Sequence, residues 1–220
     1  MASTILTKRQ QLVLSLLFKE DDIKNHFYLT GGTTLSEYYL KHRYSEDLDF
    51  FSDEEVIPSA IQVVLKKIQK QSGFIKTDYQ QSYNRNLFYL HFPDKEVIKT
   101  EFTYYPFTKI EASKVIGNII IDSLLDIAVN KAFTIYQNPR GRDFIDLYFI
   151  IKKEHWGFGE LLKKTRVKFD THIDPLQLAQ QIIKVNELKD NPRMISDYSK
   201  EEMLEFWNGE VLKLKKQTLK

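Results

Sequence analysis

Two aspartates separated by a single residue, Asp47 and Asp49, are the side chains whose type and spacing best suit chemistry. The apolar residues around them predict a strand over 48–51. Side chains alternate between the two faces of a strand, so both carboxylates project on the same side, roughly 7 Å apart. Two such carboxylates repel each other unless a cation or solvent relieves them. Because Mg²⁺ prefers carboxylate oxygens together with phosphate, the pair favours a metal–nucleotide site; the alternative is an edge strand whose acidic face is solvated.

Two adjacent glycines, Gly31 and Gly32, precede these aspartates in the sequence. The segment between them is long enough for one helix followed by a connection back to the sheet. The glycines lie between a predicted strand at 27–29 and a predicted helix at 33–42. Paired glycines let a backbone approach closely, and the amides at a helix N-terminus favour anions. We therefore expect Gly31, Gly32 and the Thr33 hydroxyl to receive phosphate groups. The alternative is a tight turn with Thr33 as a helix cap.

The elements that must position these residues divide the chain into two parts of different pattern. In the first part, the predicted helices cover 3–20, 33–42 and 56–72, and the predicted strands cover 27–29, 48–51, 74–79, 86–92 and 96–105. The second part shows helical periodicity over 122–137, 142–153, 157–168, 174–187 and 199–207. The sequence thus predicts an α+β fold, with a mixed sheet flanked by helices over 1–118 and a helical C-terminal bundle over 119–220.

The composition excludes several classes of protein and site. The 220 residues include 32 Lys and Arg against 30 Asp and Glu, which excludes a histone-like polycation and an acidic tail protein. The absence of cysteine excludes disulfides, thiolate zinc sites and a cysteine nucleophile. The five histidines show no zinc spacing, and no Gly-x-Ser-x-Gly, Walker or Rossmann motif is present. Without a signal peptide or an apolar run of about 18 residues, we expect a cytoplasmic protein with no membrane segment.

This combination of motifs resembles the nucleotidyltransferase superfamily that includes DNA polymerase β. Its members share a Gly-Gly or Gly-Ser turn, a short helix, and a strand with two carboxylates one residue apart. The segments Leu-Thr-Gly-Gly-Thr-Thr-Leu (29–35) and Arg-Tyr-Ser-Glu-Asp-Leu-Asp-Phe (43–50) resemble the opening motif of the AbiEii/AbiGii-type nucleotidyltransferase toxins. Lys131 and the segment Arg-Asp-Phe-Ile-Asp-Leu (142–147) match the later motifs of that family in order and spacing.

The resemblance implies a metal site with a third carboxylate. Superfamily members take it from a neighbouring strand, and Glu101 would join Asp47 and Asp49 there. The metal would be Mg²⁺, with Mn²⁺ as a substitute. For Glu101 the alternative is an exposed strand face on which it pairs with Lys99 or Lys109.

The resemblance also gives roles to residues of the helical part. It implies that Lys131 contacts the triphosphate, whereas a lysine on an apolar helix otherwise extends to solvent. Asp143 and Asp146 would form a wall of the catalytic site, with one of them near the nucleotide or the acceptor hydroxyl; the alternative is capping at a helix start. Arg142 would pair with an acid or contact phosphate. For Arg43 we expect a structural salt bridge; the alternative is a phosphate contact.

The activity implied is metal-dependent transfer of NMP from an NTP to an acceptor hydroxyl, with release of pyrophosphate. The acceptor would be an RNA end, such as a tRNA 3′ end, or a protein. The protein would be the toxin of a toxin–antitoxin or abortive-infection system and would have a cognate antitoxin. Basic segments at 163–168 and 213–220 would be solvated faces or would steer RNA. The alternative function is a catalytically inactive protein of the same fold that binds a nucleotide or a partner.

Overall fold

The computed structural model of the protein describes the backbone of residues 4–218 and the side chains of residues 4–215. Within this range the chain forms two compact units. The first contains the residues before Leu40 together with Ser45–Ser123, and the second contains Leu40–Tyr44 and the residues from Leu124 onward. The division at residue 118 stays a prediction about independent domains, because compactness alone does not test whether each part folds by itself.

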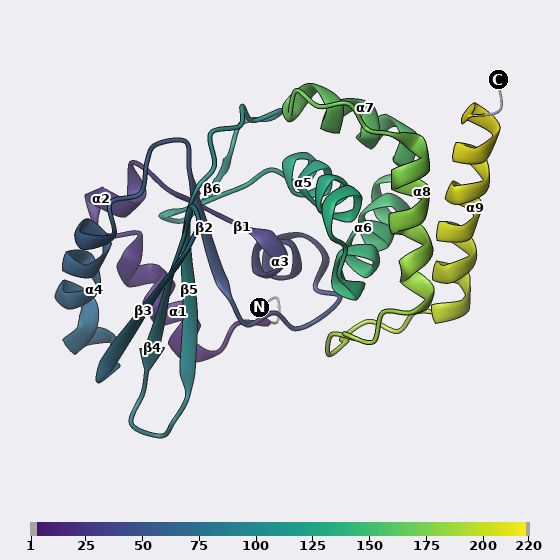
Figure 1. Ribbon diagram of the computed structural model, residues 1–220. Helices are drawn as coiled ribbons and strands as arrows, with labels where there is room; N and C mark the ends of the chain where they lie inside the picture. The colour runs from purple at the N-terminus through teal and green to yellow at the C-terminus, as the bar shows by residue number, and fades with distance from the viewer. Residues whose placement is uncertain (1–3, 219–220) are drawn as a thin grey trace. The chain divides into compact units, whose positions relative to one another are not determined.

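A mixed sheet organises the first unit, and across the described residues it has seven strands in the order β3-β4-β5-β2-β1-β7-β6 (Figure 1). The strands are β1 (Tyr28–Thr30), β2 (Leu48–Ser52), β3 (Lys76–Ser82), β4 (Arg85–His91), β5 (Val97–Tyr104), β6 (Lys114–Ile116) and β7 (Ile119–Ile121). Strand β2 pairs in parallel with β5 and antiparallel with β1, while β1 pairs in parallel with β7. This pairing confirms the predicted α+β fold with a mixed sheet.

Three helices cover one face of this sheet in the described part of the first unit (Figure 1). They are α1 (Lys8–Leu17), α2 (Asp21–Lys24) and α4 (Pro58–Ser72). The Thr7 hydroxyl caps α1, and α4 begins with a proline, whose φ suits the first helical position. The apolar faces of these helices share one core with Leu48 and Phe50 of β2. Because side chains alternate along β2, Asp49 lies on the opposite face of the sheet.

Some elements of the first unit differ from the sequence-based prediction. The helix predicted from residue 33 begins earlier, as α3 (Gly31–Thr34), and continues as a π-helix, η1 (Leu35–Leu40). The strands β6 and β7 were not predicted. Each has only three residues, too few for an alternating pattern, and β6 is exposed along its whole length.

The described elements of the second unit are helical (Figure 1). The helical region predicted over 119–220 begins later than expected, because Ile119–Ile121 form β7 of the sheet. They are α5 (Leu124–Gln137), α6 (Gly141–Glu154), α7 (Phe158–Lys168), α8 (Pro175–Ile183), the 3₁₀ turn η2 (Lys184–Asn186) and α9 (Lys200–Thr218). Helix α5 packs against α6, α7 and α8, and α9 packs along α8. The fully buried ring of Trp207 lies edge-on to Phe144 and Phe158. In the described residues no helix is long and apolar enough to cross a membrane.

Candidate active site

Three carboxylates from two stretches of the chain lie near one another in the first unit. Thr30, Asp49 and Glu101 are register partners on β1, β2 and β5, so they form one row across three neighbouring strands. Asp47 lies just before β2, and the ammonium group of Lys99 contacts both Asp47 and Glu101. We call Asp47, Asp49 and Glu101 the acidic cluster. Two of its members, Asp47 and Asp49, are half-buried, whereas only 5% of Glu101 is exposed.

Two cations of the chain contact this acidic cluster. Lys99 Nζ lies 2.8 Å from Asp47 Oδ2 and 3.7 Å from Glu101 Oε2. Arg85 donates from Nε and Nη2 to the two oxygens of Glu101, both at 2.6 Å. Burial raises the pKa of Glu101, but the hydrogen bonds and charge of Arg85 more than offset it, so that pKa lies below its usual range.

The observed pairing of Glu101 differs from the alternative considered for it. That alternative was an exposed strand face with Lys99 or Lys109 as partner, yet Glu101 is buried and its closest partner is Arg85. Arg85 lies diagonally across the β4–β5 pair, because Thr103 is its register partner. Sequence reasoning missed Arg85, since its position beside Glu101 depends on the register of this hairpin.

The Gly31 position brings the backbone against the acidic cluster. Gly31 has a φ of +75°, in the left-handed region that favours glycine. A Cβ at this position would collide with the Asp49 carboxylate, whose Cγ would be only 3.2 Å away. The turn at Gly31 therefore depends on glycine for two independent reasons, and it places the backbone directly beside Asp49.

Hydroxyl groups fix the chain on both sides of this turn. The Thr33 hydroxyl is fully buried and donates to the backbone carbonyl of Asp47. This hydrogen bond fixes the backbone that leads directly into β2. Thr33 does not cap the helix, which begins at Gly31 with Thr30 at the cap position. Thr30 donates from Oγ1 to Asp122 Oδ2 at 2.7 Å, and this buried contact was not predicted from the sequence.

The donor set of the acidic cluster fits a hard divalent cation. Its members offer carboxylate oxygens, the ligands that Mg²⁺ prefers, and Asp47 and Glu101 already attract one cation, the Lys99 ammonium group. As the side chains lie, however, no group of three or more His, Cys, Asp or Glu among the described residues is arranged to hold a metal ion. The carboxylate oxygens of the acidic cluster are therefore of the type that Mg²⁺ or Mn²⁺ binds. Several of these oxygens are already paired with Arg85 and Lys99.

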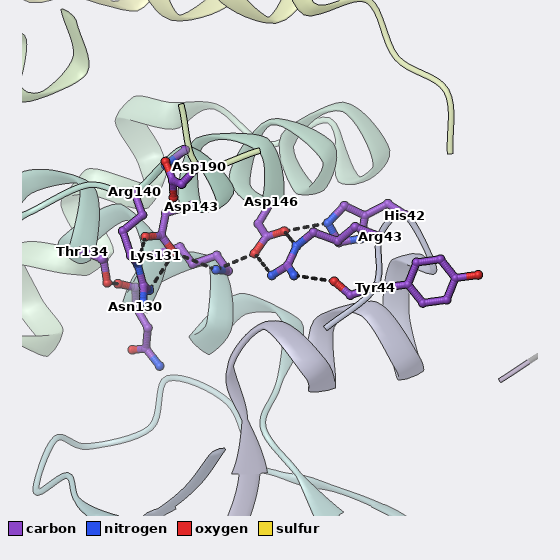
Figure 2. A network of polar contacts seen from close by, with 11 residues as sticks. His42, Arg43, Tyr44, Asn130, Lys131, Thr134, Arg140, Asp143, Asp146 and Asp190 are labelled. Atoms are coloured by element: carbon purple, nitrogen blue, oxygen red, sulfur yellow. Dashed lines mark hydrogen bonds and ion pairs between the residues drawn. The ribbon is translucent and has the colours of Figure 1, made fainter. Parts of the chain in front are cut away.

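In the second unit, a buried network surrounds Asp146 of α6 (Figure 2). Arg43 donates to Asp146 from Nε at 2.6 Å and from Nη2 at 2.8 Å. His42 Nε2 lies 2.7 Å from the same carboxylate, and Lys131 Nζ lies 2.6 Å from it. Lys131 also donates to Asp143, at 3.0 Å. The network thus joins the segment Leu40–Tyr44 to α5 and α6.

The electrostatics of this network keep its carboxylates ionised. Burial alone raises the pKa of Asp146, but the charge of Lys131 and the hydrogen bonds of Arg43 and His42 hold it well below the usual value. The pKa of Asp143 is also lowered, because Lys131 and Arg140 outweigh its burial. Burial lowers the pKa of His42, so its ring is neutral at pH 7 and donates from Nε2 to Asp146.

The structure brings Lys131, Asp143 and Asp146 together but does not include Arg142 in their network. The Lys131 side chain is only 9% exposed and is held by both aspartates, so it does not extend to solvent. Neither aspartate caps α6; the backbone amide of Gly141 at its start donates instead to Asp190 Oδ1 at 2.8 Å. Arg43 forms the expected structural salt bridge. Arg142 is half-buried, and within the described part of the chain its side chain forms no ion pair.

The basic segment at 163–168 is only partly a solvated face. Lys168 is buried and lies 2.6 Å from Asp126 of α5, so its charge is neutralised inside the second unit. Lys163 and Arg166 are exposed. In the other basic segment, Lys213 pairs with Glu210, and the side chains beyond residue 215 lie outside the described residues.

Two structures from Helicobacter pylori resemble the fold of this chain. JHP933 is similar with a TM-score of 0.58 and 21% identity, covering 97% of this chain and 96% of its own. A second structure, provisionally named a nucleotidyltransferase, also has a TM-score of 0.58, with 20% identity over 96% of this chain and 99% of its own. At these identities the likeness supports the fold alone, and it agrees with the nucleotidyltransferase-like fold predicted from the sequence.

Two comparisons were made at the level of sequence, and the family profile shows the family. The uncharacterized protein aq_aa25 of Aquifex aeolicus (strain VF5) is 35% identical over 149 residues, which are 67% of this chain and 68% of that protein. The profile of a family described as nucleotidyl transferase AbiEii toxin, type IV TA system, matches residues 14–208, which is most of the chain. The chain therefore belongs to the AbiEii family of nucleotidyl transferase toxins.

Proposed function

We propose that the protein transfers NMP from an NTP to an acceptor hydroxyl in a reaction that depends on Mg²⁺ or Mn²⁺ and releases pyrophosphate. Membership of a nucleotidyl transferase family supports the reaction type. The observation that carries the proposal is the acidic cluster beside a glycine turn, with the Asp49 carboxylate against Gly31. Carboxylates that bind a metal and a backbone that admits phosphate are both needed at such a site.

In this proposal each residue of the first unit has a defined task. Asp47 and Asp49 bind the metal, and Glu101 is the third ligand. When bound, Mg²⁺ supplies charge neutralisation on the triphosphate and lowers the pKa of the attacking hydroxyl. The turn at Gly31 and Gly32 receives a phosphate group next to Asp49, because glycine carries no side chain and its backbone amides can approach a ligand closely. Thr33 holds Asp47 in place through the backbone rather than by touching the substrate.

For the second unit we propose that Lys131 and Arg142 supply positive charge to the phosphate groups of the substrate. Asp143 and Asp146 hold Lys131 in position, which fixes its ammonium group before any substrate binds. The acceptor is an RNA end, such as a tRNA 3′ end, or a protein hydroxyl. Because the family is one of type IV toxins, we propose an antitoxin as partner and the cytoplasm as the place of action.

One observation favours a second candidate function, that of a catalytically inactive nucleotide-binding protein. Arg85 occupies both oxygens of Glu101, and Lys99 occupies Asp47, so the acidic cluster is largely neutralised by the chain itself. Calorimetry with Mg²⁺ and each NTP separates the two functions. An inactive protein binds the nucleotide without releasing pyrophosphate, whereas an enzyme releases it when an acceptor is present.

The proposal is tested by incubating the protein with Mg²⁺, each of the four NTPs labelled at the α-phosphate, and either total tRNA or total soluble protein. We expect the label to appear on an acceptor with at least one NTP, and Asp49→Asn to reduce the transfer by about 10²-fold or more. Asp53→Asn is the matched control, because Asp53 lies in the same acidic stretch but is exposed. Transfer that is equal in D49N and D53N would show that the acidic cluster does not carry the reaction.

A further inference from the structure

Lys99 has a position in the acidic cluster that the proposed reaction does not explain. It lies on β5, two residues before Glu101 and therefore on the same face of the sheet. Its Nζ is 2.8 Å from Asp47 Oδ2 and 3.7 Å from Glu101 Oε2, so one ammonium group spans two of the proposed metal ligands. The Lys99 side chain is 24% exposed, compared with 32% for Asp47. The contact is thus partly shielded from solvent.

The contacts of Arg85 show that Lys99 is not needed to neutralise Glu101. Both Glu101 oxygens accept from Arg85 at 2.6 Å, and Thr103 donates to Oε1 at 3.1 Å. The Lys99 ammonium group lies closer to Asp47, and it is also attracted by the charges of Asp49 and Glu101. A lysine ammonium group is a cation at neutral pH, because its ordinary pKa is about 10.4. Lys99 therefore lies where a cation is drawn by all three carboxylates.

We infer that Lys99 is an internal counter-cation: it occupies the cation position in the metal-free protein and must leave Asp47 before a divalent metal binds there. This inference rests on the metal site of the proposed function. An ammonium group and a divalent cation cannot both contact the same carboxylate oxygens at close range without strong repulsion. Lysine suits such a role because its point charge is carried on a flexible four-carbon stem, which can move away without a change in the strand.

The consequence is that Lys99 weakens the binding of free metal. In the absence of nucleotide, the metal has to displace an ion pair and overcome a nearby positive charge. Removing that charge by Lys99→Met, which keeps the length and apolar character of the stem, should tighten metal binding by about tenfold or more. Lys99→Arg keeps the charge and should leave the affinity close to that of the wild type.

The test is a titration of the full-length protein with Mn²⁺ alone, without nucleotide, in which the electron paramagnetic resonance signal measures the free ion. The variants are K99M, K99R and K76M, and circular dichroism checks that each is folded. K76M is the matched control, because Lys76 forms an ion pair with Asp78 on β3 of the same sheet, away from the acidic cluster. We expect tighter binding in K99M only. K99Q replaces K99M in the titration if the methionine variant does not fold.

Each outcome of this titration decides the inference. If K99M binds Mn²⁺ no more tightly than the wild type, while D49N loses binding, the inference is wrong and the proposed metal site stands. If K99M and K76M tighten binding equally, a general charge effect explains the result and the inference is also wrong. If neither the wild type nor K99M binds Mn²⁺, the inference and the metal site of the proposed function are both overturned.

Discussion

At the scale of single residues, Gly31 is the position most sensitive to added volume. We predict that Gly31→Ala lowers the free energy of unfolding by about 2–4 kcal/mol, because it combines a left-handed backbone with a collision against Asp49. Gly73 is the matched control, since its φ is +86° but a Cβ there meets nothing within 4 Å. Gly73→Ala should therefore cost only about 1–2 kcal/mol, the penalty of the backbone alone.

Urea denaturation of the two alanine variants measures this difference. Equal losses of stability in G31A and G73A would contradict the close approach between the turn and Asp49. The same comparison in the transfer assay separates the two effects: we expect G31A to lose transfer, whereas G73A retains it, because Gly73 lies at the end of α4 and outside the acidic cluster.

Single residues also show what the sequence can and cannot predict about the site. The spacing of Asp47 and Asp49 and the glycine pair were sufficient to select these positions, because strand alternation and glycine conformation are local properties. The contact of Arg85 with Glu101 depends on how β4 and β5 pair, and the contact of Lys99 with Asp47 depends on how β2 and β5 pair; both are long-range properties. For the same reason the sequence did not indicate that Asp122 receives the Thr30 hydroxyl. The roles of the site residues remain predictions.

At the scale of elements, the network around Asp146 holds the segment Leu40–Tyr44 against α5 and α6 (Figure 2). We predict that Asp146→Asn lowers the free energy of unfolding by about 3–5 kcal/mol, because it leaves the buried charges of Arg43 and Lys131 without their shared partner. The change in stability is measured by urea denaturation at pH 7, followed by far-ultraviolet circular dichroism.

The control for this prediction is Asp78→Asn on β3. Asp78 also pairs with a lysine, Lys76, but both side chains are well exposed, and exposed ion pairs contribute little to stability. We expect D78N to unfold at the same urea concentration as the wild type. A D146N variant that is as stable as D78N would show that the buried network does not hold these elements together.

Elements differ in how well the sequence predicts them. The long helices of the second unit follow from apolar periodicity over ten or more residues, a signal that packing reinforces. The π-helix η1 was not predicted, because the difference between an α-helix and a π-helix depends on hydrogen bonding and not on the apolar pattern. The buried pair of Lys168 and Asp126 was missed because a basic run normally indicates a solvated face.

At the scale of the whole molecule, the free energy of unfolding should decrease as the pH falls below 7. Glu101, Asp143 and Asp146 have pKa values below their usual range in the folded state, so each contributes stability that is present above a pKa of about 4 and is lost as the pH falls further. The lowered pKa of His42 acts in the same sense: below about pH 6.5 the unfolded chain gains a proton that the folded chain does not take up.

We therefore predict that the free energy of unfolding falls steadily from pH 7 to pH 3. Urea denaturation at intervals of half a pH unit measures this dependence, and D146N should show a weaker dependence below pH 5 than the wild type. A protein that is as stable at pH 3 as at pH 7 would contradict the pairing of these carboxylates.

The function of the whole chain was predictable to the level of its family. The order and spacing of its motifs indicated the nucleotidyltransferase toxins, and the family profile confirms this. The metal, the acceptor and the antitoxin remain predictions, because they depend on the shape and dynamics of a binding surface and on a partner molecule. Local motifs select a reaction class; they do not specify which hydroxyl attacks.

The central claim is that this chain moves a nucleotidyl group, and the position of the label in the NTP tests it most directly. The wild-type protein is incubated with Mg²⁺, total tRNA or total soluble protein, and each NTP labelled at either the α- or the γ-phosphate. We predict that the α-label appears on the acceptor and the γ-label appears in pyrophosphate. Label on the acceptor from the γ-position alone, or no transfer from either position with any of the four NTPs, would contradict the account.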